Sequence, residues 1–248
     1  MERLNKVAQI TLFFWIIKIL ATTLGETLGD LLSMTLNLGY TISLIAISII
    51  FLISLFAQLK AKRFNPFLYW LVIIGTTTLG TEISDFMDRT LGLGYAIGSL
   101  ILFSALAITL LIWYLKENKL IIYPIQSVRV ETFYWIAILF SNSLGTAFGD
   151  FLSDDIGLNY LYGAVATGGI IALVVLVHYL TKVNQIVLFW VAFIFTRPFG
   201  ATFGDLLTKP ISKGGLGLGT IPATFITVVL LGLLVFFTRR NHLKNITG

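Results

Sequence analysis

Long apolar runs alternate with short polar segments along the whole chain, and the runs are of similar length. A membrane-spanning helix needs about 20 predominantly apolar residues, because the hydrocarbon core of a bilayer is about 30 Å thick. The apolar runs meet this requirement and leave no long polar stretch between them. The pattern predicts about eight membrane-spanning helices, at residues 7–31, 40–58, 66–87, 94–115, 132–153, 159–180, 185–207 and 219–238.

Tryptophan marks an internal repeat. Trp15, Trp70, Trp135 and Trp190 are separated by 55, 65 and 55 residues, and each follows an aromatic residue. Ten residues after each tryptophan is a glycine and fifteen residues after it is an aspartate, at Gly25 and Asp30, Gly80 and Asp85, Gly145 and Asp150, and Gly200 and Asp205. The spacing predicts four two-helix repeats within one membrane domain of residues 1–248, at approximately 7–60, 61–120, 125–182 and 183–240.

The repeats also group into two halves. The first and third repeats, like the second and fourth, are offset by 120 residues, so the halves are 1–120 and 121–248. Because two spans restore the direction of the chain, all four repeats point the same way. The fold class expected is therefore an all-α polytopic membrane protein built from four parallel two-helix repeats.

Composition and charge agree with this fold class. Hydrophobic residues make up 57% of the chain and charged residues 12%, against about 25% charged residues in soluble domains. Lys and Arg gather in the loops on one side, and the opposite loops hold Arg89, Lys209 and Lys213. Cytoplasmic loops carry such an excess, so both termini are expected in the cytoplasm. The net charge of +5 thus reflects topology, and we expect no nucleic-acid partner.

Charged residues inside the spans fall on the first helix of a repeat. Each costs roughly 2.5–3.5 kcal/mol to insert, so a chain retains such residues where they are paired, hydrated or used. The candidate cation-binding acids are Glu26, Asp30, Glu82, Asp85, Asp150 and Asp205, of which Glu26, Asp30, Glu82 and Asp85 are candidate metal ligands. Supporting polar or counter-ion residues are Lys18, Thr22, Thr77, Asn142 and Arg197. Alternatively, the aspartates cap helix ends or hold the loops.

A second stripe on the same helices consists of small residues. Its glycines are Gly25, Gly29, Gly80, Gly145, Gly149, Gly200 and Gly204. Small residues four apart let membrane helices approach closely. We therefore predict that the first helices of the repeats form an inner bundle around a polar cavity, and that the second helices face lipid.

The charge of the predicted cavity favours a cation. Six acids against Lys18 and Arg197 leave a net charge of −4 if all are ionised. Oxygen ligands suit hard cations such as Mg²⁺, Ca²⁺ or Mn²⁺, and close carboxylates also hold protons. Lys18 is expected to pair with Glu26 or to extend towards the cytoplasm, and Arg197 to neutralise Asp205 or another acid.

The run from Thr23 to Asp30, Thr-Leu-Gly-Glu-Thr-Leu-Gly-Asp, and the four tandem two-span units resemble a bacterial membrane protein family. Its members have four tandem repeats with a tryptophan in each, and the function of the repeat is unknown. The resemblance implies a location in the bacterial inner membrane. The acidic-glycine motif is also locally similar to that of cation exchangers for manganese or calcium.

Three functions are compatible with these residues. The leading hypothesis is a transporter for a cation, such as a divalent metal, coupled to protons. The alternatives are a cation channel with a ring of four aspartates, and a non-transporting assembly, sensor or lipid-binding protein. The sequence contains no phosphate loop, paired-histidine zinc motif or nucleophile elbow, so we do not expect an enzyme. The expected partners are membrane lipid and a small cation, the latter as substrate, with no cofactor.

Overall fold

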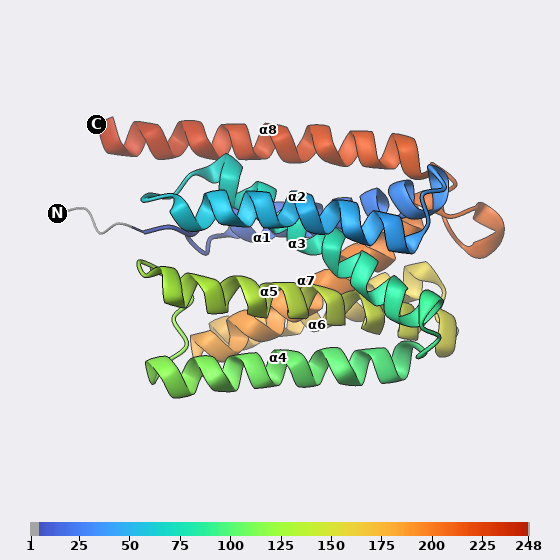
Figure 1. The fold of residues 1–248 in the computed structure, drawn as a ribbon, viewed down its shortest axis with the longest axis horizontal. Helices are drawn as coiled ribbons and strands as arrows, with labels where there is room; N and C mark the ends of the chain where they lie inside the picture. Colours follow the sequence, from blue (N-terminus) through green and yellow to red (C-terminus); the bar gives the residue numbers. More distant parts are fainter. Residues whose placement is uncertain (1–4, 248) are drawn as a thin grey trace.

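The computed structural model describes the backbone of residues 5–247, and their side chains except for Lys213 and residues 239–247. Within this part of the chain all regular secondary structure is helical. Eight long α-helices run side by side along one direction (Figure 1). They are α1 Leu12–Asp30, α2 Tyr40–Lys60, α3 Pro66–Asp85, α4 Tyr95–Glu117, α5 Val128–Asp150, α6 Tyr160–Leu180, α7 Gln185–Thr208 and α8 Thr220–Thr247.

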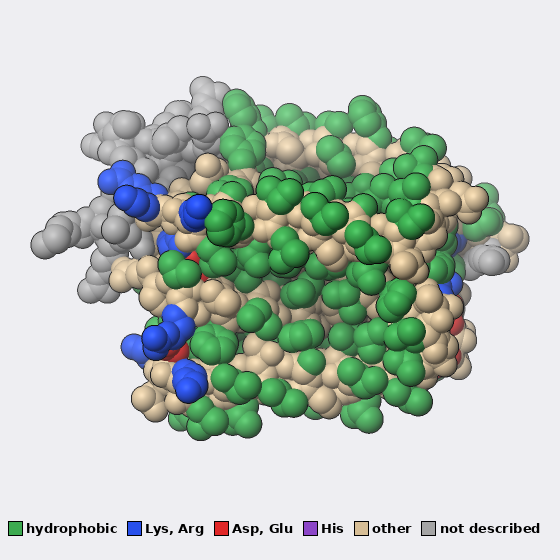
Figure 2. Space-filling view, in the orientation of Figure 1, with side chains coloured by type: hydrophobic (Ala, Val, Ile, Leu, Met, Phe, Trp, Pro, Cys, Tyr) green, Lys and Arg blue, Asp and Glu red, His purple; other side chains and the backbone are tan. Residues whose placement is uncertain are grey.

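The helices have the length and the surface of membrane-spanning segments. Seven of the described helices are long and apolar enough to cross a bilayer. The eighth, α5, is as long as the others but is the least apolar of the inner helices. Figure 2 shows a broad belt of apolar side chains between two polar ends. The predicted all-α polytopic membrane fold is confirmed.

Local sequence explains where the inner helices begin. The side chains of Thr11, Asn65, Ser127 and Asn184 each accept a hydrogen bond from a backbone N–H of the following helix. These four residues are N-caps, which satisfy donors that have no partner within the helix. At Pro66, the first residue of α3, the missing N–H causes no loss, because that group would be unpaired in any case.

Three of the inner helices change character directly after the repeated aspartate. One short π-helical segment follows each of α1, α3 and α5; the three segments are Leu31–Thr35, Phe86–Thr90 and Phe151–Asp155. The fourth inner helix, α7, continues as an α-helix to Thr208. Short π-helical segments are uncommon and often occur at functional sites. The fourth repeat therefore differs from the other three at the level of its aspartate.

The four first helices form a closed inner ring. In this ring α1 packs against α3, α3 against α5, α5 against α7, and α7 against α1. The second helices cover the ring from outside, with α2 on α3, α4 on α5, α6 on α7, and α8 on α1. Each outer helix thus packs mainly on the inner helix of the next repeat. The predicted inner bundle is present, and the repeats interlock.

Glycine sets the spacing within the ring. The repeated glycine of each inner helix meets the polar residue that lies seven positions after the tryptophan of the next inner helix. The four contacts are Gly25 with Thr77, Gly80 with Asn142, Gly145 with Arg197, and Gly200 with Thr22. A Cβ atom added at Gly145 would lie 2.5 Å from Arg197 Cβ. Each contact therefore requires a residue without a side chain.

Aromatic residues close the end of the ring at which the inner helices begin, here named the tryptophan end. Trp70 and Trp135 are buried there against Tyr69, with ring centroids 5.3 Å apart in both pairs. The Tyr69 and Tyr134 hydroxyl groups are 2.7 Å apart and share a hydrogen bond. The residues before α1 also lie across this end, where the buried Lys6 pairs with Glu131 of α5. The opposite end is named the aspartate end.

The orientation of the molecule in the membrane remains a prediction. The first described residue and the end of α8 lie at the same end of the molecule (Figure 1). Because the chain has no cysteine, topology is testable with two single variants at exposed positions. They are Lys62→Cys, in the loop between α2 and α3, and Asp155→Cys, at the end of the π-helical segment that follows α5. A membrane-impermeant maleimide added to intact cells is expected to label Asp155→Cys, and to label Lys62→Cys after permeabilisation. The opposite labelling pattern would reverse the orientation.

Candidate functional site

Polar side chains occupy the inside of the ring at successive levels. They lie three, seven, eleven and fifteen residues after the tryptophan, and this spacing of four places them on one face of each helix. All are buried. From the tryptophan end the levels contain Lys18; then Thr22, Thr77, Asn142 and Arg197; then Glu26, Thr81 and Thr146; and finally Asp30, Asp85, Asp150 and Asp205.

The first polar level is bridged by Lys18. Its Nζ donates a hydrogen bond to Asn142 Oδ1 at 2.9 Å and so connects α1 with α5 on the opposite side of the ring. The Asn142 amide donates in turn to Thr76 Oγ1 of α3 at 3.0 Å. Lys18 Nζ also lies 4.1 Å from the centre of the Phe193 ring, a distance typical of a cation–π interaction. The sequence suggests that Lys18 pairs with Glu26 or extends towards the cytoplasm. In the structure it does neither, because it is bonded to Asn142 inside the ring.

A second bridge is formed by Arg197. Its Nη2 atom lies 2.9 Å from Glu26 Oε2, and Nη1 donates to the backbone oxygen of Thr22 at 3.1 Å, both on α1. Nη2 also donates to Thr81 Oγ1 of α3, the helix opposite α7. The acid neutralised by Arg197 is thus Glu26, which lies one level nearer the tryptophan end than the aspartates.

The side chains that form these two bridges occupy the axis of the ring. The Lys18–Asn142 bond joins α1 to α5, and the Arg197–Thr81 bond joins α7 to α3. Both pairs of helices are opposite members of the ring. The polar stripes therefore converge as the sequence predicts, but at these levels they meet as side chains bonded across the axis and not as an open cavity.

Three carboxylates converge at the aspartate end, between α1 and α7. Oxygen atoms of Glu26, Asp30 and Asp205 all lie within 4.8 Å of one another. Lys209, directly after α7, places Nζ 2.7 Å from Asp30 Oδ2 and 3.1 Å from Asp205 Oδ1. Burial disfavours the charged ammonium group, but the Asp205 and Asp30 carboxylates outweigh this effect and raise the pKa of Lys209. Lys209 is therefore a cation bound between two acids from different repeats.

The other two aspartates lie around Arg89. Arg89 Nε is 3.2 Å from Asp85 Oδ1, one helical turn earlier on α3, and its guanidinium group lies over the Tyr40 ring at 5.7 Å. Arg89 also interacts electrostatically with Asp150 of α5. Asp150 also interacts with Glu26, Asp85 and Asp205, so the acids form one cluster, within which the oxygens of Glu26, Asp30 and Asp205 lie closest together.

Glu82 lies near Asp85, Asp30 and Glu26 and interacts with them electrostatically, but it is not one of the three converging carboxylates. It is fully buried, and neither carboxylate oxygen has a hydrogen-bond partner among the described residues. Its Oε1 atom faces Gly29 of α1, where an added Cβ would lie 3.6 Å away. An ionised carboxylate without partners is costly in such a place. Glu82 is therefore suited to hold a proton or to await a cation.

The candidate metal ligands are only partly brought together. Glu26 and Asp30 belong to the converging group, and its third member in the described part of the chain is Asp205. Glu82 and Asp85 lie outside that group. Three carboxylates from two helices provide the oxygen ligands that hard divalent cations prefer, so the α1–α7 group is the candidate cation site.

Arg89 and Lys209, which the charge pattern of the sequence assigns to outer loops, contact the repeated aspartates. Both lie four residues after a repeated aspartate, and this spacing places the two side chains on one helix face. With these two partly exposed residues the region contains six acids and four bases, a net charge of −2 if all are ionised. The site is therefore nearer to neutrality than the sequence indicated.

The Arg197–Glu26 pair is testable by stability. Arg197→Gln would leave Glu26 buried without its counter-charge, which costs about 3–5 kcal/mol of unfolding free energy. The double variant Arg197→Gln/Glu26→Gln is expected to recover a large part of this loss in a denaturation series in detergent. Arg129→Gln is the control, because its ion pair with Glu117 is exposed and is worth at most about 1 kcal/mol. Equal stability of Arg197→Gln and Arg129→Gln would contradict the assignment.

Comparison with known proteins gives one family. Four consecutive segments, residues 13–64, 68–119, 133–184 and 188–242, match the family model described as Repeat of Unknown Function (DUF347). Each matched segment covers most of one inner helix and of the outer helix that follows it. No curated protein and no solved structure matches the chain. The matched segments cover most of the sequence, so this chain belongs to the family of proteins built from that repeat.

Proposed function

We propose that the protein is a secondary transporter for a small cation, coupled to protons, in the bacterial cytoplasmic membrane with both termini inside. The observation that carries this proposal is the convergence of Glu26, Asp30 and Asp205 between two helices of a membrane protein. Ionisable groups within membrane helices are expensive and usually mark ion pathways or proton relays. With both termini in the cytoplasm, as the positive-inside pattern predicts, this group would lie in the outer half of the membrane.

The ligand chemistry favours a hard divalent cation, such as manganese, magnesium or calcium. Carboxylate oxygens are the ligands these ions prefer. Lys209 already places a positive charge on Asp30 and Asp205, so a substrate ion would have to displace its ammonium group. The Lys209 side chain is partly exposed and can move towards solvent when an ion enters. Lys209 would thus act as a tethered counter-ion that fills the site between transport cycles.

Protons would be carried by the acids that lack a basic partner. Glu82 is the leading candidate, because both of its carboxylate oxygens are buried without a hydrogen bond. Loss of a proton from Glu82 would place another negative charge on α3, beside Gly29 of α1. That charge would strengthen cation binding at the neighbouring Asp30, and protonation would weaken it. This reciprocal effect is what coupling between two ions requires.

A transporter fits the filled axis better than a channel. An ion moving from the aspartate end to the tryptophan end would meet the Lys18–Asn142 and Arg197–Thr81 bonds. A channel with a ring of four aspartates would need both bonds to be absent in its conducting state. In a transporter these bonds would open only while the Glu26, Asp30 and Asp205 site is closed to the outside, as in alternating access.

The same filled axis favours one other candidate, a non-transporting membrane protein that acts in assembly, as a sensor or by binding lipid. In that case the acids and bases would serve packing alone. Reconstituted protein would then show no ion flux, and a stable partner protein would co-purify with it.

Flux measurements in proteoliposomes test the transport proposal. With Mn²⁺ outside and a pH gradient, Asp30→Asn and Asp205→Asn are each expected to lower uptake about tenfold or more, since loss of one ligand worth about 1.4 kcal/mol weakens binding tenfold. Asp155→Asn, which alters an exposed acid at the end of the π-helical segment after α5, should leave uptake unchanged. Uptake equal to the unmodified protein in both site variants would remove these residues from the transport site.

A further inference from the structure

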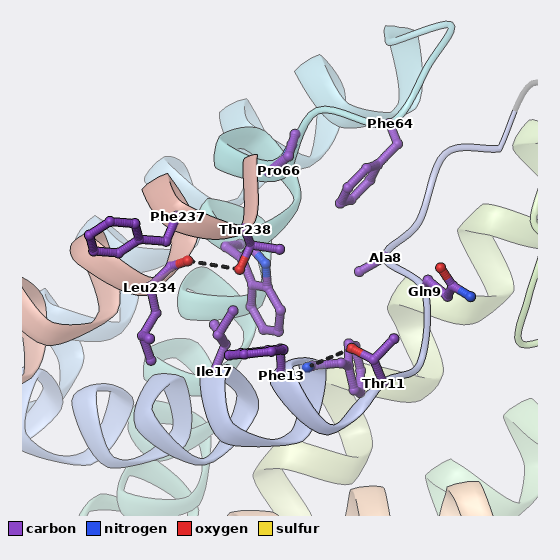
Figure 3. Close-up of a pocket in the computed structure, with 12 residues that line it drawn as sticks. Ala8, Gln9, Thr11, Phe13, Ile17, Phe64, Pro66, Leu234, Phe237 and Thr238 are labelled. Atoms are coloured by element: carbon purple, nitrogen blue, oxygen red, sulfur yellow. Dashed lines mark hydrogen bonds between the residues drawn. The ribbon is translucent and has the colours of Figure 1, made fainter. Parts of the chain in front are cut away.

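An apolar cleft of about 380 Å³ lies between α1, α3 and α8 at the tryptophan end. Figure 3 shows side chains from the start of α1, the segment before it, the start of α3 and the end of α8 pointing into one space. The lining is almost entirely apolar and includes Phe13, Ile17, Trp70 and Leu234. Thr238 also lines the cleft, and its hydroxyl group donates to the Leu234 backbone oxygen at 2.8 Å.

The internal repeat explains why this cleft exists. Helices α4 and α8 each follow a glycine with positive φ, Gly94 and Gly219, and Trp113 and Thr238 each lie nineteen residues beyond that glycine. The two helices also take equivalent places, because α4 packs on α5 as α8 packs on α1. Thr238 is therefore the counterpart of Trp113.

The Trp113 indole fills the counterpart of the cleft. It is fully buried, stacked on Phe133 with centroids 6.2 Å apart, and perpendicular to Trp190 at 6.2 Å. By their positions in the repeat, Phe133 and Trp190 correspond to Phe13 and Trp70. Both of these line the cleft beside Thr238. The α8 junction thus has walls equivalent to those of the indole pocket, with a threonine in place of the indole.

The surroundings of the cleft point to a lipid. Phe13 and Phe237, at its margin, are exposed on the membrane-facing surface. Lys62 and Arg63, both exposed, directly precede the lining residue Phe64, and basic side chains gather at this end of the molecule (Figure 2). Anionic phospholipids of the cytoplasmic leaflet are attracted by such residues.

We propose that the cleft binds one anionic phospholipid. An acyl chain occupies the space that an indole fills in the α4 junction, and the phosphate group lies near Lys62 and Arg63. The occupied cleft supplies between α8 and the ring the packing that the Trp113 indole supplies between α4 and the ring. This site is independent of the acids at the aspartate end.

Native mass spectrometry of the purified full chain with phosphatidylglycerol tests the site. Thr238→Trp restores the indole and is expected to reduce retention of one tightly bound lipid about tenfold. His178→Trp is the matched control, because His178 is the exposed counterpart on α6 and does not line the cleft. Equal retention in Thr238→Trp and the unmodified protein would show non-specific surrounding lipid only and would overturn the proposal.

Two further variants make the test independent of misfolding. Trp113→Thr opens the equivalent pocket in the α4 junction, so the number of retained lipids should rise by one. Lys62→Gln/Arg63→Gln should lower retention of phosphatidylglycerol and leave that of phosphatidylcholine unchanged. The control Lys116→Gln/Lys119→Gln, at exposed positions in the last turn of α4 and just after it, should alter neither. An unchanged preference for the anionic lipid in the Lys62→Gln/Arg63→Gln variant would exclude these residues as the headgroup site.

Discussion

The close approach of the inner helices at four glycines determines the rest of the structure. At each glycine, backbone or side-chain atoms of the next inner helix take the place that a Cβ atom would need. Without a hydrophobic force between membrane helices, such close packing and the hydrogen bonds it permits are what hold them together. Because the ring is this narrow, side chains from opposite helices reach one another, and acids from adjacent repeats share a site.

A narrow ring also explains why the repeats are not identical. The axis is occupied by one lysine and one arginine, Lys18 and Arg197, which come from different repeats and bond across different diagonals. Four copies of either residue would repel one another and would exceed the space on the axis. The first and fourth repeats therefore supply the bridging cations, and the second and third supply Thr81 and Asn142 as their neutral acceptors. The departure from four-fold symmetry is a consequence of filling a symmetric axis with a few long side chains.

The sequence predicted features that depend on position along a helix, and it failed for features that depend on neighbours around the ring. The spacing of tryptophan, glycine and aspartate predicted the repeats, the inner bundle and the common height of the aspartates. It could not predict that Lys18 bonds to Asn142, because that requires knowing which helix is opposite α1. The packing of α2 on α3 of the next repeat has no signal in the spacing either. Arg89 and Lys209 could have been recognised, since both lie one helical turn after a repeated aspartate.

Thiol cross-linking between α1 and α7 tests most directly whether the narrow ring brings acids of different repeats together. The variant Asp30→Cys/Asp205→Cys replaces two side chains whose oxygen atoms lie within 4.8 Å of each other, in a chain with no other cysteine. The structure predicts that one mercuric ion bridges both thiols and protects them from maleimide, and that adding Gly200→Leu, which forces α7 away from Thr22, abolishes the bridge. Thiols that react independently in the variant with native Gly200 would contradict a shared site.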